Sequence, residues 1–123
     1  MSTHPNVILL LSLTPDDLSR KTKRSIVSNN RLDQDSDSED DDRIKIGDNS
    51  YYIEIMEDEY DDSWQISGNE GDIIIFSLVT YGYGEKVSWN DLEKRKNELE
   101  EWAKVTCETY HCSYQIDVTA NYW

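Results

Sequence analysis

The longest apolar run of the chain covers residues 7–13 and is flanked by polar residues. A run of this length is typical of a strand that is buried on both faces, so we predict a central strand here. The sequence Thr14-Pro15-Asp16-Asp17 then predicts a helix start, because Thr14 can accept a hydrogen bond from the amide of Asp17 and proline is favoured in a first helical turn. This helix is expected to end near Asn29-Asn30.

Turn-forming residues at 47–50 separate two segments that resemble the arms of a hairpin, 43–46 and 51–56. From residue 51 to residue 64, acidic residues are interleaved with isoleucine and aromatic residues. Alternation with a period of two indicates a strand with one face toward the core and the other carrying carboxylates. We therefore predict a hairpin whose second arm is amphipathic.

A second hairpin is predicted around the turn formers at 68–71. The segments 64–67 and 72–81 would form its arms, and the second arm supplies apolar residues for the core: Ile73, Ile74, Ile75, Phe76, Leu78 and Val79. The second hairpin thus adds two strands to the first.

The C-terminal third of the chain predicts one helix followed by one strand. Ser88-Trp89-Asn90-Asp91 has the residue types of a capping box, and the helix should run to about His111. Its apolar residues recur at spacings of three, four and seven, so it should lie on a sheet: Leu92, Leu99, Trp102, Ala103, Thr106 and Tyr110. Residues 113–120 alternate again and predict the last strand.

The order of these elements is β-α-β-β-β-β-α-β, which predicts the α+β class. We expect an antiparallel sheet with two helices on one face, in the split β-α-β plan of ferredoxin-like domains with an extra hairpin. The 123 residues suit a single α+β domain.

Charge is distributed very unevenly along this chain, which has 26 Asp and Glu, 12 Lys and Arg, and a net charge of -14. The segment 33–72 alone holds sixteen acids and two bases, whereas the segments before and after it carry net charges of +3 and -3. Such an acidic protein is not expected to bind DNA, RNA or anionic lipid directly. Residues 33–42 contain no apolar residue, and they predict an acidic disordered loop within the domain.

The sequence predicts a cytoplasmic protein without a membrane segment. Its longest apolar run is far shorter than the ~20 residues that span a bilayer. Residues 1–6 contain no Lys or Arg, unlike the start of a signal peptide. The two cysteines, Cys107 and Cys112, do not form a disulfide framework, and we expect reduced thiols.

Cys107, His111 and Cys112 lie close together in the sequence and form a fragment of a zinc site. A fourth ligand at a fixed spacing is missing, although His4 could in principle be recruited. Structural residues at a helix end are much commoner than metal ligands, so we predict neither a metal nor another cofactor.

Residues 33–42 have the oxygen density of a calcium loop but lack the glycine that an EF-hand requires at its sharp turn. Ser36 and Ser38 precede acidic residues and could be phosphorylated by an acid-directed kinase, a point that the sequence leaves open. Carboxylate pairs are so frequent here that none of them indicates catalysis. We predict no catalytic residues and a protein that is not an enzyme.

Carboxylates interleaved with aromatic residues favour a protein-binding surface. Duplex DNA presents one negative charge per ~1.7 Å of its axis, so an array of carboxylates can compete for a basic groove that holds nucleic acid. The residues predicted to bind a partner are Glu54, Glu57, Asp58, Glu59, Tyr60, Asp61, Asp62 and Trp64, together with Asp40, Asp41 and Asp42.

In bulk properties the chain resembles small acidic inhibitors: DNA mimics of the anti-CRISPR and anti-restriction type, and immunity proteins that neutralise nucleases. That resemblance implies an inhibitor whose partner is a basic protein, a nuclease or another nucleic-acid-binding effector. The alternative is a regulatory protein-interaction module whose acidic loop binds basic segments without inhibiting a partner. Both hypotheses are compatible with a homodimer.

Overall fold

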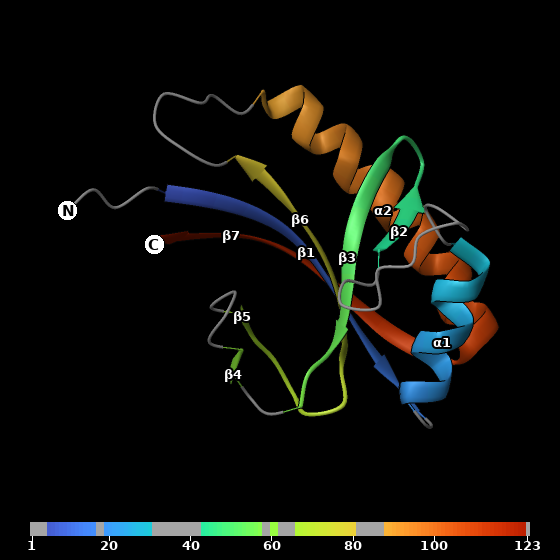
Figure 1. Cartoon of the computed structure of the whole chain (residues 1–123). Helices are drawn as coiled ribbons and strands as arrows, with labels where there is room; N and C mark the ends of the chain where they lie inside the picture. The colour runs from blue at the N-terminus through green and yellow to red at the C-terminus, as the bar shows by residue number, and fades with distance from the viewer. Residues whose placement is uncertain are drawn as a thin grey trace.

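The computed structural model describes residues 5–16, 19–30, 43–57, 60–61, 66–80 and 88–122 (Figure 1). The acidic run 33–42 lies outside these residues, so its predicted disorder stays a prediction. The elements follow one another as β1 (Pro5–Pro15), α1 (Ser19–Asn30), β2 (Arg43–Ile46), β3 (Asn49–Ile55), β4 (Tyr60–Asp61), β5 (Ile66–Ser67), β6 (Ile73–Thr80), α2 (Trp89–Tyr110) and β7 (Cys112–Tyr122).

Five of these strands form one antiparallel sheet in the order β2-β3-β6-β1-β7. Both β1 and β3 are antiparallel to β6, so β1 and β3 are parallel to each other with β6 between them. α1 leads from β1 to the edge strand β2, and the hairpin after β2 returns the chain as β3. The second helix, α2, connects β6 to the parallel strand β7 across β1. The predicted α+β class is confirmed, and the strand order is consistent with a split β-α-β plan to which β2 adds an edge strand.

β1 is an interior strand buried on both faces, as its apolar run predicts, although the middle position of the sheet belongs to β6. Leu9 and Leu11 are fully buried on one face, and Ile8 and Leu10 are buried on the other. β1 also contains a proline at each end, but its pairing with β6 covers only residues 7–13. The missing N–H groups of these prolines therefore cost no hydrogen bond to β6.

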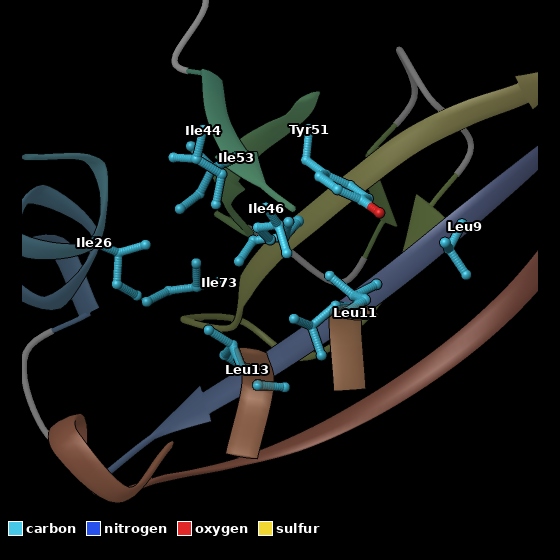
Figure 2. Close-up of a cluster of buried hydrophobic side chains, with 12 residues drawn as sticks. Leu9, Leu11, Leu13, Ile26, Ile44, Ile46, Tyr51, Ile53 and Ile73 are labelled. Atoms are coloured by element: carbon cyan, nitrogen blue, oxygen red, sulfur yellow. The ribbon is translucent and has the colours of Figure 1, made fainter. Parts of the chain in front are cut away.

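Both helices cover the same face of the sheet, which we call the helix face. Ile26 of α1 and Leu99 of α2 belong to one buried cluster with alternate residues of the strands, part of which Figure 2 shows. Tyr51 of β3 is the largest side chain in this cluster, and its hydroxyl has no hydrogen-bond partner among the described residues. Burial raises the pKa of Tyr51 to about 12.

The opposite face of the sheet is also apolar, which the sequence predicts only in part. Phe76 is fully buried there and stacks on Tyr52 of β3 with ring centroids 5.5 Å apart. The guanidinium of Arg43 lies 4.8 Å from the Tyr52 ring centroid. β3 contains one carboxylate, that of Glu54. The predicted carboxylate-bearing face therefore holds at Glu54, whereas Tyr52 occupies the neighbouring position on that face.

The predicted start of the first helix is wrong, because Thr14 and Pro15 belong to β1 and α1 begins at Ser19. Pairing with β7 continues to Pro15, opposite Cys112. Strand pairing over this length outweighs the local preference of Thr14 for a helix cap. The end of the helix at Asn30 is confirmed.

The first hairpin is confirmed and the second is wrong. Gly47 opens the tight turn between β2 and β3 with a φ of 62°, a conformation that favours glycine. By contrast, β5 pairs with β4 in a separate two-stranded sheet, and β6 pairs with β3 and β1. Because β3 and β1 occupy both edges of β6, no edge is left for β5, and residues 73–76 are buried on both faces of the sheet.

The second helix begins and ends where its pattern predicts, after Ser88 and before His111. The side chain of Ser88 makes no capping hydrogen bond, so this part of the predicted capping box is absent. At the other end His111 adopts a left-handed conformation, and its N–H donates to the carbonyl oxygen of Cys107. The chain can therefore reverse at once into β7.

Candidate functional site

An acidic segment, residues 56–72, connects β3 to β6, and the structure describes it except for residues 58–59 and 62–65. It holds seven acidic residues and no basic residue. Within it, Tyr60 pairs with Ser67 and Asp61 pairs with Ile66 to form the short β4–β5 ladder. Figure 1 shows this ladder set apart from the five-stranded sheet. We call residues 56–72 the acidic connection.

Backbone hydrogen bonds close the base of the acidic connection. The N–H of Met56 donates to the carbonyl oxygen of Asp72 at 2.9 Å, and the N–H of Gly71 donates to the carbonyl oxygen of Met56 at 2.8 Å. The side chain of Met56 is buried in the apolar cluster opposite the helices. The two ends of the connection are therefore held together and anchored to the sheet.

The carboxylate of Asp72 adds a second anchor at this base. It is 5% exposed, and it accepts hydrogen bonds from the Thr14 hydroxyl at 3.0 Å and from the Asn69 N–H at 3.2 Å. A buried carboxylate with both oxygens engaged is a structural group. No local pattern indicates this role, because Thr14 and Asp72 are 58 residues apart in the sequence.

Two of the predicted partner-binding residues have described side chains, and they differ in exposure. Glu54 is half-buried on β3, opposite Ile74 in the sheet register. Glu57 is exposed at the start of the acidic connection and forms a 3.2 Å ion pair with Arg20 of α1. The side chains of this pair are 75% and 77% exposed, so the pair adds little stability and can exchange partners readily.

The remaining predicted residues are placed only in part. Tyr60 and Asp61 lie in β4, within the same connection as Glu57. Outside the described residues lie Asp58, Glu59, Asp62 and Trp64, together with Asp40, Asp41 and Asp42. The structure thus places Glu57 beside Arg20 and places Tyr60 and Asp61 in β4, and the positions of the other residues stay predictions.

A cavity of about 230 Å³ lies beside the base of the acidic connection, on the face opposite the helices. Its lining is mostly polar and includes Ser12, Thr14, Asp72, Gln115 and Asp117. Asp117 accepts a hydrogen bond from the Gln115 amide at 3.1 Å, and the Thr14 hydroxyl is bonded to Asp72. No basic residue contributes to the lining among the described residues, so the cavity does not suit a phosphate.

Cys107 and Cys112 meet where α2 turns into β7, and both are free thiols. Their sulfur atoms are 3.0 Å apart. Burial raises the pKa of Cys107 to about 12, and the adjacent Cys112 thiol acts in the same direction, so Cys107 keeps its proton at neutral pH. Within the described part of the chain, which excludes His4, no three potential ligands converge on a metal site.

Comparison of the chain with protein-family models, curated proteins and solved structures finds no match. In the described ranges, no helix combines the length and the apolar character needed to cross a bilayer. The functional interpretation therefore rests on the chemical character of the protein surface.

Proposed function

We propose that this protein is a cytoplasmic inhibitor that binds the basic, nucleic-acid-handling surface of a partner protein. Its acidic connection would occupy the groove in which the partner holds nucleic acid. The observation that carries this proposal is the closed base of the connection, where Met56, Gly71 and Asp72 are joined by backbone hydrogen bonds.

A closed base matters because a charged segment loses less conformational entropy on binding when its ends are already fixed. The β4–β5 ladder restrains the connection further between Tyr60 and Ser67. Acidic residues occupy five of the six positions from 57 to 62. Carboxylates so close together in the sequence suit cationic side chains that otherwise bind phosphates.

The acidic residues are concentrated in the acidic connection. This concentration favours docking in one orientation over a general attraction to cations. On α2, Glu100 is flanked by Lys96 at 3.6 Å and Lys104 at 3.9 Å, so charges there are largely balanced. α1 carries four basic residues and no acidic residue. Electrostatic steering would therefore orient the acidic connection toward a basic partner.

The test is affinity capture from the source cell with the protein as bait, followed by competition. Wild type and the triple variant Glu57→Lys, Asp58→Lys, Glu59→Lys are used in parallel, and bound proteins are eluted with duplex DNA. We expect the wild type to retain a nucleic-acid-binding protein that duplex DNA displaces. The triple variant should not retain it.

The captured protein is then assayed for nucleic-acid binding or cleavage with increasing amounts of wild type. Inhibition that saturates at a fixed stoichiometry supports the proposal. A captured partner that binds nucleic acid equally well with and without this protein would contradict inhibition and favour the regulatory interaction module. Equal capture by wild type and the triple variant would show that the acidic connection is not the binding surface.

A further inference from the structure

The two edges of the five-stranded sheet are built differently. β2 has four residues and carries the exposed charges Arg43 and Lys45, which discourage pairing with another strand. β7 has eleven residues, and Asp117 is its one charged residue. Its pairing with β1 continues without a bulge from Tyr122 to Cys112. Among the described residues no strand pairs with the outer side of β7.

The register identifies which backbone groups of β7 point outward. The N–H of Asp16 donates to the carbonyl oxygen of His111, so these residues form a hydrogen-bonded pair in the same register as β1 and β7. Hydrogen-bonded and non-bonded pairs alternate along an antiparallel ladder. Residues 113, 115, 117, 119 and 121 therefore direct their N–H and C=O groups to β1. The outward groups belong to residues 112, 114, 116, 118, 120 and 122.

The two prolines of β1 support this assignment independently. Pro15 is opposite Cys112 and Pro5 is opposite Tyr122, both at positions assigned as non-bonded. A proline has no N–H to donate, so it fits only at such positions of the ladder. The outer edge of β7 is thus a regular row of six donors and six acceptors.

We propose that β7 pairs with β7 of a second copy, antiparallel and centred on Val118, to form a dimer with a continuous ten-stranded sheet. In this register Val118 faces its own counterpart, and both residues direct their backbone groups into the new ladder. The outward groups of residues 114–122 then bond to the same segment of the second copy, giving about ten backbone hydrogen bonds. A two-fold axis at Val118 makes the contact self-complementary.

Side chains select this register over its neighbours. A centre at Asp117 would set two carboxylates directly opposite each other, which is destabilising. A centre at Val118 instead places Asp117 opposite Thr119 of the second copy. A centre at Ile116 would bring the second copy against a residue that already packs on the helix-face core. Val118 has 51% of its surface exposed, and pairing would cover it.

The distribution of charge also favours a second copy at this edge. Two chains that each carry a net charge of -14 repel each other least where acidic residues are scarce. β7 holds one acidic residue in eleven, compared with seven in the seventeen residues of the acidic connection. The dimer does not depend on what the acidic connection binds, and it would carry two such connections.

The test is sedimentation of the full chain between about 1 μM and about 500 μM, the range suited to the micromolar affinity expected of a small interface. We expect a concentration-dependent dimer. Val118→Lys sets two ammonium groups opposite each other and should weaken association at least tenfold. Val105→Lys is the matched control, because Val105 is 65% exposed on α2 and lies outside the proposed contact. This control should dimerise like wild type.

Cross-linking tests the register directly. Facing residues of a hydrogen-bonded pair have Cα atoms ~5.5 Å apart, within disulfide range, so Val118→Cys should form a covalent dimer under mild oxidation by glutathione disulfide. Val105→Cys and wild type, which retain Cys107 and Cys112, are the controls and should not. A chain that stays monomeric throughout the range, a dimer that survives Val118→Lys, or equal cross-linking of the two cysteine variants would overturn the proposal.

Discussion

The acidic connection and the outer edge of β7 suit opposite kinds of partner. The acidic connection has seven carboxylates and no base, so a second copy of the chain is repelled there and a cationic surface is attracted. The β7 edge has one carboxylate, an exposed Val118 and a row of outward backbone groups with no partner strand among the described residues. Side-chain charge and backbone hydrogen bonding thus act on different regions of the same surface.

This difference shows how one fold can carry two surfaces of different chemical character. Each segment is fixed by β1 or by its neighbours: Thr14 of β1 binds Asp72 at the base of the connection, and β7 pairs with β1 along its full length. One interior strand, β1, therefore contacts both the base of the acidic connection and the hydrogen-bonding edge strand. Changes to one segment should leave the other unaffected.

The largest expected effect comes from reversing charge in the acidic connection. Replacing Glu57, Asp58 and Glu59 with Lys should weaken partner binding by about 3 kcal/mol or more, because attraction becomes repulsion at three positions. Deletion of residues 35–41 should have a much smaller effect, since that run has no apolar residue to fix its charges in one geometry. Titration of partner activity with each variant measures both, with circular dichroism as the control for folding. Loss of inhibition on deletion, with a silent charge reversal, would place the binding surface in residues 33–42.

Proline substitution on β7 tests which backbone groups point outward. Thr119→Pro removes a donor to β1 and should destabilise the fold by about 3 kcal/mol, whereas Val118→Pro removes an outward donor and should cost much less. Val118→Pro should also reduce self-association. Urea unfolding of the monomer at low concentration gives the stability of each variant. If Val118→Pro is the more destabilising of the two, the assigned alternation along β7 is wrong.

Salt should affect the two segments in opposite directions. Partner binding through the acidic connection should slow about tenfold between low salt and several times the physiological level, as screening shortens the Debye length below ~8 Å. Dimerisation through β7 should become stronger over the same range, because salt screens the repulsion between two chains of charge -14. Association rates and sedimentation at matched ionic strengths provide the data. A partner on-rate that does not change with salt would rule out the electrostatic mechanism.

The smallest effect should come from releasing Glu57 from its intramolecular ion pair. Arg20→Ala frees this carboxylate and removes a nearby positive charge, so partner binding should strengthen by a few tenths of a kcal/mol, about 0.3. Thermal stability should change little, because the pair is exposed. Calorimetry of partner binding measures the gain, and Lys21→Ala is a neighbouring control that also removes one positive charge. Equal gains in the two variants would show that net charge, and not the pair with Glu57, is responsible.

Local patterns in the sequence were sufficient for the elements that periodicity defines. The apolar run at 7–13 specifies a strand buried on both faces, and the spacing of Leu92, Leu99 and Ala103 specifies a helix on a sheet. The turn at Gly47 follows from the need for a positive φ. These features depend on neighbouring residues, so one sequence is enough to predict them.

The tertiary structure alone decided which residues far apart in the sequence contact each other. Thr14 has the residue type of a helix cap, but pairing of β1 with β7 keeps it in a strand and brings it to Asp72. Likewise β6 does not form a hairpin with β5, because β3 and β1 occupy its two edges. The uneven charge was visible in the sequence, whereas the closed base of the acidic connection and the outward backbone groups of β7 were not. Both arise from backbone hydrogen bonds, which no side-chain pattern encodes.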